Sequence, residues 1–289
     1  MRTYFYAPVS TVALLLLCLM FAPSRRVVGD RMAFGSSPQD ITNSLLVPVH
    51  LPTSQVAKSF AELCAKDPVG ALSHSLQKYK REVDGYNCSF IKQERLRGDL
   101  KSTEVIDCEF QQSPFSVLMR WKEGKGRAEA TLYVSGENND HLLIIPAGST
   151  QKAALKLLGK GFAKRSLDSS DAREAARYPA DQFGFYIGTL RVYEAWKAAQ
   201  DRQELQVEYR GLQPVAELNG KKCHVLHRTC VQPEEEGMTQ VTIYFDPQTH
   251  YQVGAVLREN DNLIGRYFFD KVQLNPKFQA NYFTAENFK

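Results

Sequence analysis

The stretch from Tyr86 to Ala147 decides the fold. It reads YNCSFIKQERLRG at 86–98, PFSVLMRW at 114–121 and TLYVSGENNDHLLIIPAG at 131–148. These segments hold short runs of aromatic, β-branched and aliphatic residues, and Gly, Asn, Asp or Pro marks the breaks between them. Within 115–121 apolar residues recur at every second position, which predicts a strand with one buried and one wetter face. The stretch therefore predicts five antiparallel strands joined by hairpins.

The first predicted hairpin carries Cys88 on one arm and Cys108 on the other. If paired residues have numbers that sum to 196, the two cysteines face each other and can form a disulfide. A two-residue turn at Gly98-Asp99 gives a sum of 197 and puts them on opposite faces. The sequence leaves both registers open. After residue 24 the number of cysteines is odd, so at least one thiol stays free in any pairing.

Helical sequence precedes and follows these strands. Asp67-Pro68 is a good helix start, because Asp caps free N–H groups and Pro is tolerated at the first helical position. Apolar residues then recur at steps of three and four up to Val83, and Gly85 is expected to end the helix with positive φ. A helical insert is expected at 149–200, with an aromatic-rich helix from Asp181 to about Ala199.

The C-terminal third returns to a period of two. Asn219-Gly220 is its strongest hairpin signal, and Asp246-Pro247 marks another turn. The order of elements predicts an α+β fold, an antiparallel sheet with helices against one face. The candidate strands are Glu204–Tyr209, Cys223–Val231, Thr239–Phe245, Gln252–Arg258 and Leu263–Val272.

The first 24 residues have the features of a signal peptide. Arg2 precedes an apolar run from Val12 to Ala22 that is short for a membrane span, and Ala22 and Ser24 fit a small-x-small cleavage site. An uncleaved anchor remains the alternative. Residues 25–56 have no sustained periodicity and are expected to be a linker, and 57–289 form a single domain. This predicts an exported protein, periplasmic or extracellular, in which disulfides can persist.

The composition and the missing motifs argue against several functions. The 289 residues are 43% hydrophobic, enough for a packed core, and their net charge of +4 does not indicate nucleic-acid binding. No Gly-x-Ser-x-Gly, Walker or His-Glu-x-x-His motif occurs. The cysteines and histidines of 223–230 alternate between strand faces and cannot close a tetrahedral site alone. We therefore expect no catalytic residue, metal or cofactor. The oligomeric state is left open.

Lysines recur every four residues in the expected insert, at Lys152, Lys156, Lys160 and Lys164. On a helix this spacing gathers them on one side. Such a side predicts transient contact with an anionic membrane surface or an acidic partner, and an ordinary solvated face is the alternative.

The stretches quoted above resemble an uncharacterised bacterial family of exported domains of unknown function. They are joined by IYFDPQTHYQVGAVLREND at 243–261 and RYFFDKVQLNPKFQANYF at 266–283, so the resemblance covers roughly 57–289. The order of strands is also similar to the lipoprotein carriers LolA and LolB and to the RseB-type periplasmic sensors. That resemblance implies a strongly curved antiparallel sheet, a half-open barrel, with helices packed on its concave face.

The same resemblance implies an apolar cavity for a lipid or lipoprotein ligand between the sheet and the helices. We expect the protein to be a non-enzymatic binding protein, and the alternative is an envelope sensor or scaffold module with no small ligand. Every expected lining residue would serve equally well as ordinary core. The expected lining residues are Phe90, Phe115, Val117, Met119, Trp121, Phe183, Ile187 and Leu190.

Overall fold

The computed structural model describes residues 59–288. The chain divides into two units, 1–47 and 48–289, and the description below concerns the second. The predicted signal peptide at 1–24 and the predicted linker at 25–56 lie outside the described residues. No helix of the described part is long and apolar enough to cross a membrane.

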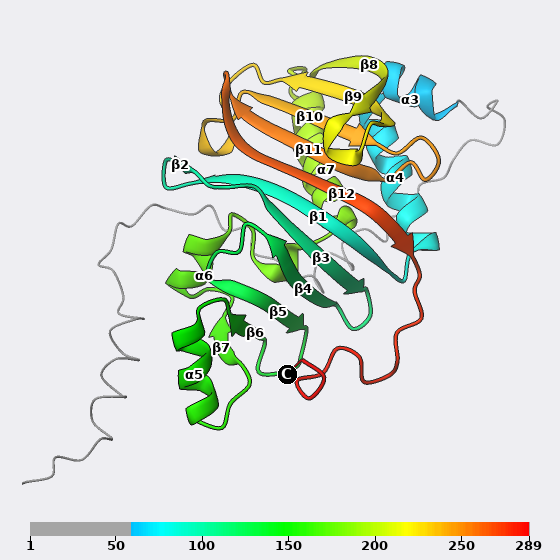
Figure 1. The fold of residues 1–289 in the computed structure, drawn as a ribbon. Coiled ribbons are helices and arrows are strands. Elements are labelled where there is room, and N and C mark those ends of the chain that lie inside the picture. Colours follow the sequence, from blue (N-terminus) through cyan, green and yellow to red (C-terminus); the bar gives the residue numbers. More distant parts are fainter. Residues whose placement is uncertain (1–58, 289) are drawn as a thin grey trace, which may run out of the picture. The chain divides into compact units, whose positions relative to one another are not determined.

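A twelve-stranded antiparallel sheet organises the described chain (Figure 1). The strands follow the order β7-β6-β5-β4-β3-β1-β12-β11-β10-β9-β8, and the short β2 pairs with β1 outside this path. The end strands β7 and β8 are not neighbours, so the sheet is open. The strands are β1 (Gly85–Leu96), β2 (Asp99–Leu100), β3 (Glu104–Gln111), β4 (Ser116–Glu123), β5 (Ala128–Val134), β6 (His141–Pro146), β7 (Ala163–Ser166), β8 (Gln206–Val215), β9 (Lys221–Thr229), β10 (Gln240–Phe245), β11 (Gln252–Glu259) and β12 (Asn262–Leu274).

The helices occur before the sheet and between β6 and β8. The α-helices are α3 (Phe60–Lys66), α4 (Pro68–Glu82), α5 (Ser149–Leu157), α6 (Ser170–Ala175) and α7 (Phe185–Asp201). Short 3₁₀ turns are η1 (Ala180–Gln182), η2 (Ala216–Leu218) and η3 (Glu235–Gly237). In Figure 1 α4 and α7 lie together behind the strands of the C-terminal half. The predicted α+β class with an open, curved antiparallel sheet is confirmed.

Helix α4 begins as predicted but ends for a different reason. Asp67 caps it and accepts a hydrogen bond from the Gly70 N–H at 2.8 Å. The predicted role of Gly85 as a residue with positive φ is wrong, because Gly85 is the first residue of β1. A glycine is needed there because a Cβ would lie 2.5 Å from the Phe110 carbonyl oxygen.

The expected helix with four lysines is also wrong. Helix α5 ends at Leu157, and Gly159 follows with φ +67°. The Gly159 N–H donates to the Lys156 carbonyl at 3.0 Å and the Lys160 N–H to the Leu155 carbonyl at 2.9 Å, which is a Schellman termination. Lys160 therefore lies in the turn and Lys164 on β7. Asp181 likewise lies in η1 and does not cap α7, whose N-cap is Gly184.

The register of the first hairpin is the one that pairs the cysteines. Cys88 lies opposite Cys108, which is the predicted sum of 196. At the turn itself Leu96 pairs with Asp99, a sum of 195, so the two-residue turn is Arg97-Gly98 and not the Gly98-Asp99 turn that gives 197. Both cysteines are buried thiols in the structure. Their oxidation to a disulfide stays a prediction.

A cluster of three histidines lies where α3 and α4 meet the sheet. His74 of α4 and His250 of the β10–β11 turn share a hydrogen bond of 3.0 Å between Nε2 and Nδ1. The Phe60 ring stacks on His250 with the ring centres 4.1 Å apart. The Tyr209 hydroxyl lies 2.6 Å from Nδ1 of His224, the third histidine. Because a hydrogen bond between two imidazoles needs one nitrogen without a proton, at least one of the His74 and His250 rings must be neutral.

Burial lowers the pKa of all three histidines. Lys78 and Arg81 lower the pKa of His74 further, while Glu82 raises it. His74, Lys78 and His224 lower the pKa of His250, and Asp246 raises it, as it does for His224. The usual pKa of a histidine is about 6.5. Below this pH the three histidines bind protons more readily in the unfolded chain than in the folded chain. The stability that they contribute is therefore present above that pH and falls as the pH drops.

The double variant His74→Gln, His250→Asn tests this cluster. Asn tolerates the left-handed backbone at position 250, where φ is +61°, and both side chains keep hydrogen-bonding groups. We expect the urea midpoint of the natural chain to fall between pH 7 and pH 5, and the double variant to show a smaller fall. An equal fall in the two proteins would contradict the account.

Candidate functional site

The inner face of the sheet is set by the alternation of β1. Tyr86, Cys88, Phe90, Lys92 and Glu94 occupy every second position of this strand, and all five are buried. Because strand side chains alternate between faces, they form one row on the face that the helices cover. The row is apolar at its beginning and charged at its end. The candidate site is this inner face together with its cover.

The neighbouring strands extend the apolar part of the row. Phe110 of β3 lies opposite Tyr86, and Phe269 of β12 lies opposite Phe90. Val117 of β4 pairs in turn with Phe110. These side chains belong to one cluster that spans both halves of the sheet, with Phe269 packed against it half-buried.

Six of the eight expected lining residues meet in this cluster. Phe90, Val117 and Phe183 are buried members of it, and Phe115, Met119 and Trp121 pack against it half-buried. Ile187 and Leu190 lie further along α7 and belong to no part of this cluster. The contacts are between protein side chains, and whether any of these residues contacts a ligand stays a prediction.

The cover of the inner face is the segment Arg177–Tyr186, here called the cover segment. Phe183 inserts its ring among those of the sheet, 5.3 Å from Phe90 and 5.7 Å from Phe269 between ring centres. The Phe185 ring lies tilted against that of Tyr86, with the ring centres 4.3 Å apart. Gly184 lies between the two rings with φ +113°, and a Cβ there would lie 2.5 Å from the Tyr86 hydroxyl. Only glycine therefore lets the chain pass this close with both rings facing the sheet.

Several polar side-chain atoms of this segment are buried without a hydrogen-bond partner. Among the described residues, they include the hydroxyl of Tyr186, Nε of Arg177 and Oδ1 of Asp181. Burial raises the pKa of the Asp181 carboxyl, and Asp168 and Asp140 raise it further. Each buried polar group without a partner costs about 1–3 kcal/mol. The closed position of the cover segment is therefore less favourable than its ring contacts alone suggest.

A few contacts of charged side chains hold the cover segment in place. Arg191 of α7 stacks 3.9 Å above the ring of Tyr178 and donates to Oε1 of Gln182 at 2.8 Å. Arg177 forms an ion pair with Glu236 of η3. These contacts come from α7 and from the C-terminal half, so they do not depend on the strands beneath the rings.

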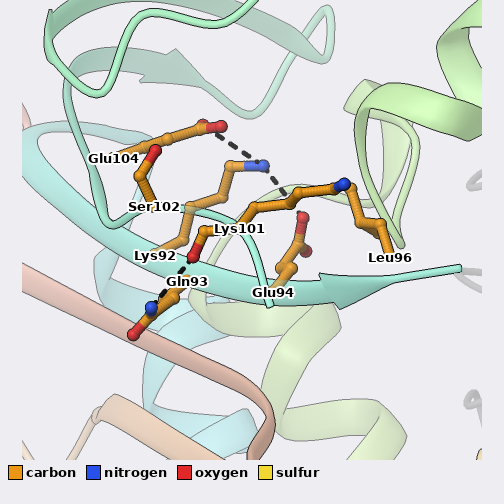
Figure 2. Close-up of a pocket in the computed structure, with 7 residues that line it drawn as sticks. All are labelled: Lys92, Gln93, Glu94, Leu96, Lys101, Ser102 and Glu104. Atoms are coloured by element: carbon orange, nitrogen blue, oxygen red, sulfur yellow. Dashed lines mark hydrogen bonds and ion pairs between the residues drawn. The ribbon is translucent and has the colours of Figure 1, made fainter. Parts of the chain in front are cut away.

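The charged end of the row is a closed network around Lys92 (Figure 2). Nζ of Lys92 lies 3.0 Å from Glu94 and 3.4 Å from Glu104. Nε1 of Trp121 donates to Glu104 at 2.9 Å, and the hydroxyl of Tyr267 donates to Glu94 at 3.0 Å. The pocket between these side chains has a volume of about 10 Å³, about the space for one water molecule.

The network keeps Lys92 charged. Desolvation lowers the pKa of this buried amine, but the charges of Glu94 and Glu104 outweigh it, so the pKa is raised. A protonated amine is not a nucleophile, so Lys92 is suited to fixing two carboxylates and not to covalent chemistry. The network thus closes one end of the apolar row with paired charges.

This network was not predicted from the sequence. Its signal was present, because Lys92 and Glu94 continue the alternation of Tyr86, Cys88 and Phe90 along one strand. Charged residues at the end of an amphipathic strand are usually exposed, so the alternation alone does not predict that Lys92 and Glu94 are buried. Trp121, which was expected to line the apolar site, packs against the apolar cluster and also donates from Nε1 to the network.

A family model covers the part of the chain that contains the inner face. Residues 83–289 match the family model described as "Protein of unknown function (DUF1571)". The chain belongs to this family. The resemblance to an uncharacterised family is thus confirmed, and the matched DUF1571 region includes the apolar row, its cover and the Lys92 network. No curated protein matches the chain.

Several solved structures are similar to the DUF1571 chain at low identity. A crystal structure of MucB shares 14% identity with a TM-score of 0.40 and covers 75% of this chain, which spans 62% of MucB. A LolA superfamily protein from Nitrosomonas europaea shares 9% with a TM-score of 0.32, covering 74% of this chain and 97% of its own. Lipoprotein LppX from Mycobacterium tuberculosis shares 9% with a TM-score of 0.34, covering 74% and 100%.

The variant Lys92→Met tests the charged network of the DUF1571 region. Removing the ammonium leaves two buried carboxylates without a cation, so we expect the free energy of unfolding to fall by about 3–5 kcal/mol in urea denaturation. The triple variant with Glu94→Gln and Glu104→Gln should recover much of this loss.

Lys78→Met is the matched control for Lys92→Met. The ion pair of Lys78 with Glu82 is partly exposed on α4, and its loss should cost no more than about 0.5 kcal/mol. A loss for Lys92→Met as small as that of the control would contradict the assigned role.

Proposed function

We propose that the protein is a non-catalytic binding protein that takes up an apolar ligand against the inner face of its sheet. The ligand would be the acyl chain of a lipid or of a lipoprotein partner. It would lie on Phe90, Val117 and their neighbours, in the position that the Phe183 ring occupies. Export by the predicted N-terminal signal would place this binding outside the cytoplasm.

The observation that carries the proposal is that polar atoms of the cover segment are buried without hydrogen-bond partners. Opening the segment would return the Tyr186 hydroxyl, Nε of Arg177 and Oδ1 of Asp181 to water. That gain would offset part of the cost of exposing the Phe183 and Phe185 rings. A segment whose buried polar atoms lack hydrogen bonds when it is closed is suited to opening. A segment that served only as core would be expected to have these atoms hydrogen-bonded.

The energy for uptake would come from apolar contact. Burying apolar surface contributes roughly 25 cal/mol per Å², so an acyl chain that replaces Phe183 would regain what the displaced ring loses. Gly184 provides the pivot, because its φ of +113° is open to glycine and strained for other residues. The contacts of Arg191 with Tyr178 and Gln182 would then set how readily the cover opens.

The second candidate is an envelope sensor or scaffold with no small ligand. Its support is the direct contact of Phe183 with Phe90, Phe110 and Phe269, which fills the inner face with protein. In that case the Phe183 ring would be permanent core. The two candidates differ in whether removal of this ring creates a binding site.

Uptake of a fluorescent fatty acid by Phe183→Ala decides between them. For a binding protein we expect the natural chain to bind the probe and Phe183→Ala to bind it about tenfold more tightly, because the ring no longer competes. The affinity of Phe183→Leu for the probe should lie between those of the natural chain and Phe183→Ala. Phe183→Leu replaces Phe183→Ala in the test if the alanine variant does not fold, because removing a buried ring can cost about 3–5 kcal/mol of stability.

Phe288→Ala is the matched control, since Phe288 is a buried ring of a separate cluster. It should leave uptake unchanged. Two results together would contradict the binding proposal. Neither the natural chain nor either Phe183 variant binds the probe, and native mass spectrometry finds no ligand on protein purified gently from its host envelope.

A further inference from the structure

The turn between α5 and β7 exposes two adjacent leucines. Leu157, the last residue of α5, is 80% exposed, and Leu158 is 51% exposed. Figure 1 shows this turn projecting beyond the sheet at the lower left of the view. The Schellman termination at Gly159 holds the two side chains at the tip. Exposed leucines side by side are costly in water, so this tip is suited to a partner that buries them.

Helix α5 is held loosely enough for such a role. None of its nine residues is buried, although it carries Ala153, Ala154 and Leu155. It lies over β6, near the end of the sheet opposite β8. The helix therefore adds little to the core and presents its C-terminal end to the surroundings.

The tip is surrounded by positive charge. Residues 149–164 contain four lysines and no Asp or Glu. Two of these lysines have polar partners, since Lys152 pairs with Glu129 at 2.5 Å and Lys164 donates to Asn138 at 3.1 Å. Within the part of the chain that the structure describes, Lys156 and Lys160 pair with no carboxylate. Their exposed ammonium groups lie on either side of Leu157 and Leu158 in the sequence.

We propose that this tip, Lys156–Lys160, docks on an anionic lipid bilayer. The two leucines would enter the boundary between headgroups and acyl chains, and Lys156 and Lys160 would contact lipid phosphates along their flexible stems. Protein interfaces favour Trp, Tyr and Arg and are depleted in lysine, whereas leucine beside lysine is the composition of a membrane-docking surface. The charge and the apolar tip thus favour a bilayer over an acidic protein.

Docking at the tip does not require uptake of a ligand at the inner face. The two surfaces share no residue, since the inner face is built from β1, β3, β4 and β12. The tip would hold the protein at a membrane, whether or not the cover segment opens. Each property can therefore fail without the other.

A fluorescent reporter at the tip gives the most local test. We expect the emission of Leu157→Trp to shift to shorter wavelength when vesicles of phosphatidylcholine and phosphatidylglycerol, mixed two to one, are added to the exported chain. Brominated lipid should quench it. Leu212→Trp is the matched control, because Leu212 is 50% exposed on the edge strand β8. It should show neither effect.

Sedimentation with the same vesicles measures the strength of docking. Leu157→Ser with Leu158→Ser should bind about a hundredfold more weakly, from roughly tenfold for each leucine. The affinity of Lys156→Gln with Lys160→Gln for the vesicles should fall about fivefold for each lysine. High salt should lower the affinity of the natural chain by the same factor. Leu212→Ser should bind like the natural chain.

Three results would overturn the proposal. They are an unchanged emission of Leu157→Trp with anionic vesicles, equal shifts with pure phosphatidylcholine, or equal binding of the leucine variant and Leu212→Ser. Uptake of a fluorescent fatty acid by the leucine variant, measured without vesicles, reports on the inner face separately. A variant that loses docking and keeps uptake supports the tip as an independent surface.

Discussion

The pairing of β1 with β12 is the interaction on which the rest of the structure depends. It joins residues 85–96 to residues 262–274 and so unites a sheet whose two halves are far apart in sequence. Its register places Phe269 beside Phe90 and Tyr267 beside Lys92. A shift of β12 by one residue would turn Phe269 and Tyr267 to the other face. The aromatic row and the charged network therefore follow from one register.

The inner face combines two ways of burying polar groups. At its charged end the Lys92 cation lies between two carboxylates, and each carboxylate accepts a further hydrogen bond, from Trp121 or from Tyr267. In the cover segment, by contrast, the Tyr186 hydroxyl, Nε of Arg177 and Oδ1 of Asp181 are buried without a hydrogen-bond partner. A satisfied network resists change, whereas an unsatisfied one favours exposure. This contrast places the rigid part of the molecule at the strands and the part suited to motion at residues 177–186.

The strands were predictable because their signal is local. Period-two patterns and turn residues located β3 to β6 and the five C-terminal strands, and the Cys88–Cys108 register was one of two that the sequence allowed. The helices of the insert were less predictable. Gly159 ends α5 through two backbone hydrogen bonds, and this termination outweighed the regular spacing of Lys152, Lys156, Lys160 and Lys164. The histidine cluster was missed because its members come from α4, β9 and a hairpin turn.

The candidate site was predictable only in its apolar part. Phe90, Phe115, Val117 and Phe183 were expected together because apolar side chains gather wherever a sheet is covered. The role of Phe183 as a ring inserted by the cover segment depends on Gly184 and on the space above Tyr86, which no local pattern records. The burial of Lys92 and Glu94 depends in the same way on Tyr267, which lies more than 170 positions away along the chain.

The central claim is that the cover segment opens without unfolding the sheet, and native-state thiol labelling of Ala180→Cys tests it most directly. Ala180 lies in η1 and packs half-buried against the aromatic cluster. The account predicts that Cys at this position is labelled through a local opening whose free energy lies well below that of global unfolding and changes little with low urea. Labelling with the free energy and urea dependence of global unfolding would contradict it.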